Sequence, residues 1–326
     1  MNRYLIWLEW PEKCFRIDAE ALRALKDLVP PGSEIRRVRT ESAFLKALPS
    51  ATHAIVWHFR SDWFARAPKL KVLATPGAGR ELVPKEGPPG VTIHFGGYHG
   101  AIIAETVVGF MFAWAHGFFR PELKGDSPWR TAWPRTLLGD KCSLVAGTHA
   151  VIVGYGRIGK AIGAKLEALG VRVTGFGRRN LGGLSPAAKT ADWLILALPS
   201  DTGTDGFLGP KRLRLLPRRC VVVNVGRGNA VDEPALLAAL RTGRLAGAYL
   251  DVFSREPGPL AHVGGTVPGA AGGTVPGAAG GTVPADILGT VPAALPWNLV
   301  RTPHSSAFCA QYVKMCLKEL KDEGLV

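Results

Sequence analysis

Three glycines at a fixed spacing constrain the fold of this chain more than any other feature. Gly154, Gly156 and Gly159 follow the apolar run 150–153 and open a segment with helical periodicity, 160–169. Between a strand and a helix, the first glycine permits a tight turn, the second lets the backbone approach a diphosphate, and the third lets helix and strand pack closely. In a chain with 40 glycines, a merely structural turn is the alternative. The flanking patterns favour dinucleotide binding, with the diphosphate against the helix N-terminus.

Length and composition set the broad class of the protein. At 326 residues the chain is long enough for two domains, and its 47% apolar content can build packed cores. The five cysteines are scattered and include no C-x-x-C pair. This pattern predicts reduced thiols in a cytoplasmic protein, with neither a disulfide framework nor a metal site. The first ten residues are too short and too acidic for a signal peptide, and we expect a strand there.

One apolar run and one basic run call for separate interpretation. Residues 101–119 are strongly apolar, but Glu105 and His116 interrupt them, so we expect a buried helix and no membrane span. The net charge of +14 suggests nucleic-acid binding as a hypothesis, with 211–219 as the densest basic stretch. No aromatic residue is interleaved there to stack on bases. We therefore interpret it as a solvated helix face with its following turn and expect no nucleic-acid partner.

Strand-like and helix-like segments alternate along the chain, which predicts parallel sheets with crossover helices. We expect an α/β fold with two doubly wound parallel-sheet domains of the Rossmann or flavodoxin type and a cleft between them. Residues 1–98 plus 305–326 form the expected substrate domain, and 99–304 the expected dinucleotide-binding domain. The expected strands are 4–8, 35–38, 54–59, 70–75, 91–95, 150–153, 171–175, 193–198, 221–225 and 246–250, and the expected helices are 19–28, 41–48, 101–119 and 307–320.

A repeat with a period of eight residues interrupts this pattern. The unit GGTVPGAA occurs from Gly264 and from Gly272, its first five residues recur from Gly280, and a degenerate copy reaches Pro292. The segment is too short and too poor in apolar residues for a solenoid. Because Gly and Pro dominate it, we interpret 264–292 as a duplicated loop insertion without a function of its own.

Three segments after the glycine turn carry polar groups at the ends of apolar runs. They are 223–233, 248–257 and 300–306, and their central groups are Arg227, Asp251 and His304. In an open α/β sheet such residues lie at the carboxyl ends of the strands, where ligands bind. An imidazole stays protonated at neutral pH beside a carboxylate, and a guanidinium binds a carboxylate bidentately. These residue types suit hydride transfer to a keto acid.

Together these motifs resemble the D-isomer-specific 2-hydroxyacid dehydrogenase family, and most closely its glyoxylate/hydroxypyruvate reductase-like members. The matching motifs are VGYGRIG at 153–159, NVGRG at 224–228 with VDE at 231–233, LDVF at 250–253 with EP at 256–257, and TPH at 302–304. The resemblance implies an NAD(P)-dependent oxidoreductase of small 2-keto acids. It also implies a homodimer, with the 101–119 helix and the arm after it at the interface.

The resemblance implies a role for each matching residue. His304 is the expected general acid/base, Glu256 its acidic partner, and Arg227 the group that binds the substrate carboxylate. The family's substrate loop falls on Gly77, Ala78 and Gly79, although the neighbouring Pro76 and Arg80 depart from its commoner form. Asp251 is expected to contact the nicotinamide carboxamide. The expected cofactor-binding residues are Gly154, Tyr155, Gly156, Arg157, Ile158, Gly159, Arg178, Arg179, Pro199, Val225, Asp251 and His304.

The end of the second strand of the dinucleotide-binding domain bears on the choice of cofactor. NAD sites carry an Asp or Glu there, which binds the ribose hydroxyls. Here Gly177 stands in that place, followed by Arg178 and Arg179. Two guanidiniums attract a 2′-phosphate, so we expect a preference for NADP(H), with NAD(H) use as the alternative. A catalytically inactive, dinucleotide-sensing corepressor or scaffold is the alternative to an enzyme.

Overall fold

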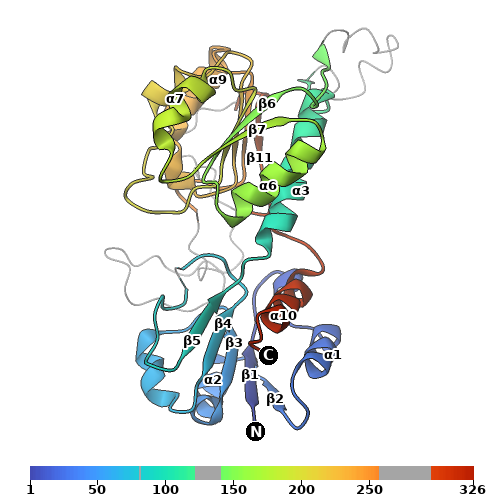
Figure 1. Cartoon of the computed structure of the whole chain (residues 1–326), viewed down its shortest axis with the longest axis vertical. Helices are drawn as coiled ribbons and strands as arrows, with labels where there is room; N and C mark the ends of the chain where they lie inside the picture. The colour runs from blue at the N-terminus through green and yellow to red at the C-terminus, as the bar shows by residue number, and fades with distance from the viewer. Residues whose placement is uncertain (81, 122–140, 257–294) are drawn as a thin grey trace. The chain divides into compact units, whose positions relative to one another are not determined.

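The computed structural model describes residues 1–80, 82–121, 141–256 and 295–326. The described residues form two compact units (Figure 1). The first unit comprises Met1–His99 and Phe308–Val326, and the second comprises the described residues between Gly100 and Ala307. The expected boundaries, after residues 98 and 304, differ from these by one and three residues. The GGTVPGAA repeat lies outside the described residues.

The first unit contains a parallel five-stranded sheet in the order β2-β1-β3-β4-β5. Its strands are β1 (Arg3–Trp7), β2 (Glu34–Arg37), β3 (His53–Val56), β4 (Val72–Thr75) and β5 (Thr92–Phe95). Its helices are α1 (Ala19–Leu28), α2 (Glu41–Ala47) and α10 (Tyr312–Asp322), with 3₁₀ turns η1 (Lys13–Phe15), η2 (Leu48–Ser50) and η3 (Ser61–Arg66). This strand order is that of a flavodoxin-like sheet.

Local sequence signals set where these helices begin. The Asp18 side chain accepts a hydrogen bond from the Ala21 N–H at the start of α1, and Thr40 does the same for Ala43 at the start of α2. Each such cap is worth about 1 kcal/mol. The C-terminal helix α10 returns to this unit and lies beside α1 (Figure 1). Glu319 holds it there by accepting hydrogen bonds from the Gly97 N–H at 2.9 and 3.0 Å.

The second unit contains a parallel six-stranded sheet in the order β11-β10-β9-β8-β6-β7. Its strands are β6 (His149–Val153), β7 (Arg172–Phe176), β8 (Trp193–Leu196), β9 (Val221–Asn224), β10 (Gly247–Leu250) and β11 (Leu299–Arg301). Its helices are α3 (His99–Ala115), α6 (Arg157–Ala168), α7 (Leu184–Ala188), α8 (Pro210–Leu213) and α9 (Glu233–Arg241), with 3₁₀ turns η6 (Leu181–Gly183) and η7 (Gly228–Ala230). The first residue of α3 belongs to the first unit.

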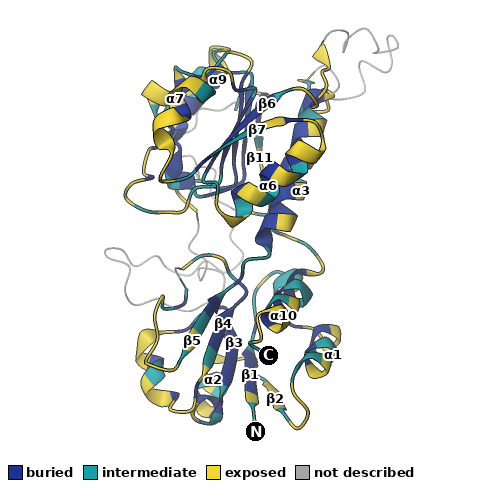
Figure 2. Ribbon diagram, viewed as in Figure 1, coloured by how far each residue is buried: buried dark blue, intermediate teal, exposed yellow. Residues whose placement is uncertain are grey.

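Both faces of the second sheet are covered, and its four central strands, β10, β9, β8 and β6, are accordingly buried at every position. In β6, Val151 and Val153 pack on the side of α7 and α9, whereas Ala150 and Ile152 pack on the side of α3 and α6. These central strands are buried and the outer faces of the helices are exposed (Figure 2). Each fully buried Val or Ile side chain contributes about 1.5–3 kcal/mol. The sequence therefore reads as unbroken apolar runs rather than as alternating ones.

The predicted α/β class with two doubly wound parallel sheets is confirmed. The predicted bounds of two helices were wrong. The helix expected at 101–119 runs from His99 to Ala115, because Gly117 at φ 77° ends it, with the Phe118 N–H bonded to the Ala113 carbonyl. The helix expected from residue 307 begins only at Tyr312. In the described part of the chain, no helix is both long and apolar enough to cross a membrane.

Candidate active site

The three polar segments meet at the carboxyl edge of the second sheet. The strand register aligns Asn224 with Leu250 and Leu250 with Arg301, the last residues of β9, β10 and β11. The residues that follow these strands therefore lie at one edge. They include three predicted catalytic residues, Arg227, Glu256 and His304, together with Asp251, all of which belong to the second unit.

His304 and Glu256 form a direct pair. The distance from His304 Nδ1 to Glu256 Oε2 is 2.7 Å, and the other carboxylate oxygen accepts the Phe253 N–H at 2.7 Å. The His304 side chain is 51% exposed and that of Glu256 is 27% exposed. The imidazole is thus accessible from solvent, while the carboxylate is bound on both oxygens. The hydrogen bond through Nδ1 fixes the orientation of the His304 ring. Nε2, on the other edge of the ring, is the nitrogen that can contact a ligand.

The two groups shift each other's pKa in opposite directions. The hydrogen bond that His304 donates to Glu256 raises the pKa of His304 above its ordinary value, against the effects of burial and of the Arg227 charge. Burial tends to raise the pKa of Glu256. The hydrogen bond and charge of His304, the Phe253 N–H and the Arg227 charge outweigh it, so the pKa of Glu256 falls below its ordinary value. Each group therefore stabilises the charged form of the other, the imidazolium of His304 and the carboxylate of Glu256.

Asp251 holds the segment that carries His304. Its side chain is fully buried, and its Oδ1 accepts hydrogen bonds from the Thr302 hydroxyl and from the N–H groups of Ser305 and Ser306 at 2.5–3.1 Å. The Asp251 carbonyl accepts the His304 N–H at 2.8 Å. His304 has φ 54°, in the left-handed region that few residues other than glycine adopt. The anchored turn around it maintains this conformation.

The glycines on either side of Arg227 are required by close backbone approaches. A Cβ on Gly226 would lie 2.5 Å from the Leu198 nitrogen, and a Cβ on Gly228 would lie 1.8 Å from the Phe253 carbonyl carbon. Arg227 therefore follows β9 in a turn whose two glycines each pack directly against another backbone segment. The Arg227 side chain is partly exposed. The Gly-Arg-Gly pattern positions the guanidinium near the His304–Glu256 pair, whose pKa values it influences.

Sequence reasoning assigned no role to two buried polar residues that support this site. The Asn224 amide accepts the Gly226 N–H and donates to the Arg227 carbonyl, which fixes the turn that bears Arg227. Glu233 is 6% exposed and accepts the Ser254 N–H at 2.6 Å, which fixes the segment leading to Glu256. Burial raises the pKa of Glu233. Its position directly after Asp232, the cap of α9, was the available sequence signal.

The glycine turn has the shape that a diphosphate requires. Gly154 has φ 95°, and a Cβ there would lie 2.4 Å from the Ala197 carbonyl oxygen; a Cβ on Gly159 would lie 2.4 Å from the Gly154 oxygen. Gly156 differs, because a Cβ there would meet no atom within 4 Å. Packing within the protein does not explain the glycine at 156, whereas an approaching ligand does. The residues present therefore fit a dinucleotide.

The other predicted cofactor residues flank this turn. Arg157 and Ile158 begin α6 behind its cap, Gly156. Val225 is buried just after β9, and Pro199 is exposed after β8. The Tyr155 ring packs between α6 and β7, in the space that side chains at 163 and 175 would otherwise fill. The backbone of Tyr155, rather than its ring, faces the turn.

Arg178 and Arg179 are both exposed in the loop after β7. Asn180 closes this loop by accepting the Gly177 N–H at 2.7 Å and donating to the Gly175 carbonyl at 3.0 Å. A Cβ on Gly177 would meet no atom within 4 Å. The end of β7 thus offers two guanidiniums and open space where an acid stands in NAD sites.

The predicted substrate loop belongs to the first unit. Gly77, Ala78 and Gly79 follow β4, the Gly77 N–H donates to the Thr75 hydroxyl at 3.3 Å, and the Gly77 carbonyl accepts the Gly96 N–H at 3.1 Å. A Cβ on Gly77 would approach the Trp57 ring at 3.8 Å. The loop is therefore held against the ends of β3 and β5, at the carboxyl edge of its own sheet.

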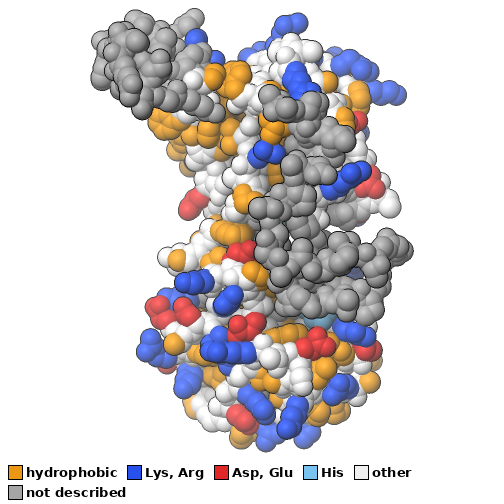
Figure 3. Space-filling model, turned by 180° about the vertical axis from the view of Figure 1, so that it is seen from behind, with side chains coloured by type: hydrophobic (Ala, Val, Ile, Leu, Met, Phe, Trp, Pro, Cys, Tyr) orange, Lys and Arg blue, Asp and Glu red, His pale blue; other side chains and the backbone are white. Residues whose placement is uncertain are grey.

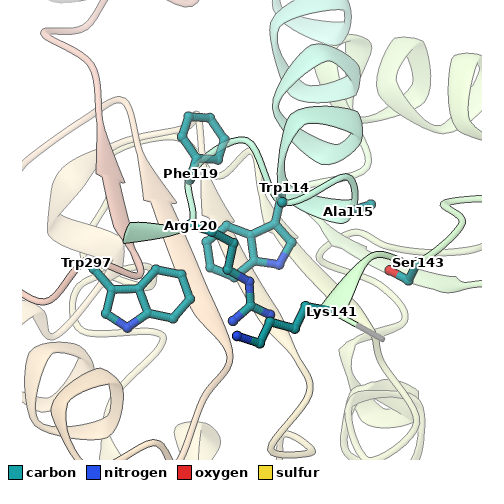
Figure 4. Close-up of a pocket in the computed structure, with 8 residues that line it drawn as sticks. Trp114, Ala115, Phe119, Arg120, Lys141, Ser143 and Trp297 are labelled. Carbon is teal, nitrogen blue, oxygen red and sulfur yellow. The ribbon is translucent and has the colours of Figure 1, made fainter. Parts of the chain in front are cut away.

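A small pocket of about 50 Å³ lies at the C-terminal end of α3, away from the predicted site residues. Trp114 and Trp297 stack at 6.0 Å between ring centroids, and the Arg120 guanidinium lies 5.2 Å from the Trp297 ring centre (Figure 4). The Trp114 ring occupies the space that a side chain at 247 would need. This aromatic cluster covers the first residue of β10, Gly247.

Comparisons with known proteins identify the family to which this chain belongs. The profile of the D-isomer specific 2-hydroxyacid dehydrogenase NAD binding domain matches residues 129–263. A glycerate dehydrogenase from Methylorubrum extorquens is 31% identical over 207 residues, which cover 61% of this chain and 65% of that enzyme. A glyoxylate reductase from Korarchaeum cryptofilum is 30% identical over 253 residues, which cover 72% of this chain and 73% of that enzyme. The chain belongs to the D-isomer specific 2-hydroxyacid dehydrogenase family.

Solved structures of this family share the fold over nearly the whole chain. A D-isomer specific 2-hydroxyacid dehydrogenase from Lactobacillus delbrueckii, in its NAD-complexed form, superposes with a TM-score of 0.73 at 19% identity and covers 99% of this chain and 96% of its own. An NADPH-dependent glyoxylate/hydroxypyruvate reductase from Sinorhizobium meliloti gives 0.67 at 22% identity, covering 100% and 96%. The predictions of the family, of an enzyme of this family and of an NAD-binding domain are confirmed.

Proposed function

We propose that this 2-hydroxyacid dehydrogenase reduces small 2-keto acids of the glyoxylate or hydroxypyruvate type with NADP(H). The observation that carries the proposal is the 2.7 Å His304–Glu256 pair beside Arg227 at the carboxyl edge of the dinucleotide-binding sheet. The bound cofactor supplies a hydride. The names of the glyoxylate reductases among the relatives support the substrate class.

His304 acts as the general acid in reduction. Its Nδ1 is held by Glu256, so the Nε2–H delivers a proton to the carbonyl oxygen of the substrate. Glu256 stabilises the imidazolium before transfer, and its charge lowers the energy needed to keep the proton at neutral pH. In the reverse direction the neutral imidazole accepts the proton of the 2-hydroxyl group. Such acid–base assistance contributes about 10²–10⁴-fold to the rate.

Arg227 anchors the substrate. Its planar guanidinium matches a carboxylate and fixes the position of the adjacent keto carbon. In the first unit, the backbone N–H groups of Ala78 and Gly79 are proposed to bind a carboxylate, whereas the Gly77 N–H already donates to the Thr75 hydroxyl. Anchors of this kind are selective for acids, so aldehydes and ketones without a carboxylate should be poor substrates.

The cofactor preference rests on Arg178 and Arg179. Both arginines are exposed at the end of β7, and no acid occupies that strand end. A 2′-phosphate adds two negative charges that guanidiniums bind well. Arg157, at the start of α6, and the turn glycines hold the diphosphate, while the exposed Pro199 lines the nicotinamide half, with the buried Val225 and Asp251 supporting it from beneath.

The decisive experiment is a panel of small 2-keto acids assayed with NADPH and with NADH by loss of absorbance of the reduced cofactor. We expect turnover of glyoxylate and hydroxypyruvate, faster with NADPH. Binding of dinucleotide without turnover of any 2-keto acid would instead indicate a sensing or scaffolding protein. Replacing both arginines, Arg178→Ala with Arg179→Ala, should weaken NADPH binding about tenfold or more and leave NADH binding unchanged.

We also propose that the protein is a cytoplasmic homodimer. All five cysteines are free thiols, as expected in a reducing compartment. Phe118 and Leu144, near the C-terminal end of α3, are 71% and 72% exposed, which suits a contact with a second copy.

On the face seen in Figure 3, Lys and Arg side chains are scattered rather than gathered in one basic patch. On this face the described residues form no basic patch of the kind that binds nucleic acid.

A further inference from the structure

An ion pair joins the two loops on either side of the glycine turn. The Arg178 Nη2 lies 2.8 Å from the Asp201 Oδ2, although 23 residues separate them. Arg178 follows β7 and Asp201 follows β8, and these strands are the two neighbours of β6 in the sheet. The glycine turn directly follows β6, so the ion pair connects the loops that flank it. This is the place where the strand order reverses and where dinucleotides bind in such sheets.

The two partners differ in how firmly they are held. The Arg178 side chain is 86% exposed, whereas that of Asp201 is 35% exposed. The Asp201 Oδ1 accepts the Gly203 N–H at 3.0 Å, and its backbone N–H donates to the Thr204 hydroxyl at 3.1 Å. Thr204 is itself buried and donates to the Pro199 carbonyl at 2.8 Å. Asp201 is therefore a fixed carboxylate, and Arg178 is the movable partner.

We propose that Asp201 is a specificity-determining residue of the cofactor site, which holds Arg178 in an ion pair that the 2′-phosphate of NADP(H) must replace. This inference rests on the proposed assignment of Arg178 to the 2′-phosphate. The Asp201 carboxylate pairs with the Arg178 guanidinium before the cofactor binds, and it repels the 2′-phosphate once the cofactor is bound. Both effects weaken NADPH binding and leave NADH binding almost unchanged, because a ribose hydroxyl carries no charge.

Asp201 also supplies an acid that the end of β7 lacks. In NAD sites the carboxylate at the end of the second strand binds the ribose hydroxyls. Here a carboxylate from the loop after β8 reaches the same neighbourhood, but its Oδ2 pairs with Arg178 and its Oδ1 accepts the Gly203 N–H, so we expect it to bind no ribose hydroxyl. The site therefore combines arginines that favour NADP(H) with one acid that limits this preference. We expect measurable binding of both cofactors in the wild-type protein.

The test is the binding of NADPH and of NADH to the full chain and to Asp201→Asn, measured by calorimetric titration. Asparagine keeps a side-chain oxygen that can accept the Gly203 N–H, so the loop should retain its shape. We expect Asp201→Asn to bind NADPH about threefold to fivefold more tightly, as removal of an exposed ion pair permits, with NADH binding unchanged. Asp205→Asn is the matched control, because Asp205 is an exposed acid in the same loop that pairs with Asn229 instead.

A double substitution identifies the partner through which Asp201 acts. In the background of Arg178→Ala, Asp201→Asn should no longer tighten NADPH binding by the same factor, because the competing pair is already gone. Equal gains for NADPH and NADH, or an equal gain in Asp205→Asn, would overturn the inference. So would unchanged NADPH binding in an Asp201→Asn protein that melts at the wild-type temperature. These results leave the proposed reaction standing, whereas a wild-type protein that binds neither cofactor removes both.

Discussion

His304 Nδ1 and Glu256 Oε2 lie 2.7 Å apart, although 48 residues separate them in the sequence. The two residues come from segments that follow β10 and β11, which are adjacent parallel strands. The pairing therefore depends on the sheet and not on the length of the connection between the residues. Loop length changes the free energy of closing such a connection only slowly, so the chain tolerates the long segment between them.

Substitution Glu256→Gln should shift the pH dependence of the reaction to lower pH. His304 must be protonated for reduction, and Glu256 raises its pKa. The reduction rate is therefore high below this pKa and falls as the pH rises through it. Without the carboxylate charge, the fall should occur nearer the ordinary value of about 6.5. At neutral pH we expect kcat for reduction to drop about tenfold to 100-fold.

The reverse reaction provides a check on this assignment. Oxidation needs the neutral imidazole, so its rate rises with pH through the same pKa, and the rise should also move to lower pH in Glu256→Gln. Rate–pH profiles in both directions measure this. A profile that keeps its midpoint while kcat falls would mean that Glu256 acts only on the structure.

Substitution Arg227→Lys should lower kcat/KM about 10²-fold or more, because an ammonium keeps the charge but loses the two parallel hydrogen bonds of a guanidinium. NADPH affinity, measured by titration, should stay within about twofold of wild type. Equal losses of keto-acid turnover and of cofactor binding would contradict a role in anchoring the substrate.

Two glycines of the turn should respond differently to alanine. Gly156→Ala introduces a Cβ into open space, so the melting temperature should be nearly unchanged while NADPH affinity falls about tenfold or more. Gly154→Ala forces φ 95° on an alanine and a contact of 2.4 Å with a carbonyl oxygen, which should cost about 1–3 kcal/mol of stability. Thermal melts and cofactor titrations of both variants separate the two effects. Equal destabilisation would show that Gly156 serves packing only.

Substitution Phe118→Asp should weaken the proposed dimer. Phe118 is 71% exposed near the end of α3, and a charge buried in an apolar contact between copies is costly. Light scattering after size-exclusion chromatography should show a shift from dimer to monomer. Leu181→Asp is the control, because Leu181 is also a partly exposed apolar residue, 38% exposed, in η6. A monomeric wild-type protein would refute the proposal directly.

Much of the secondary structure follows from local patterns. The helix expected at 19–28 has those bounds, since Asp18 caps its start. The expected strands lie within a few residues of the observed ones because most of them are apolar runs between turn residues. The end of α3 was misplaced because the apolar pattern continues to Phe119, and a single left-handed glycine at 117 overrides it. The strand β11 has only three residues and was not among the expected strands, although the polar group at His304 indicated the end of an apolar run there.

The site residues also fall into those that local sequence predicts and those that only the tertiary structure reveals. The spacing of the glycines and the polar group after each apolar run pointed to Gly156, Arg227 and His304. The supporting roles of Asn224 and Glu233 were missed, because a buried amide or carboxylate is recognisable only through the backbone groups that it satisfies. Likewise, the pairing of Arg178 with Asp201 connects loops whose proximity depends on strand order.

Amino-acid order alone specifies the kinds of elements, the dinucleotide turn and the chemical groups available for catalysis, because periodicity and glycine spacing act over a few residues. Tertiary structure decides which of those groups meet. The pairing of His304 with Glu256, the burial of Asp251 beneath the histidine turn and the bridge between Arg178 and Asp201 all arise from parallel strands placing distant residues at one edge. Strand order and register, which no short stretch of sequence encodes, set that proximity.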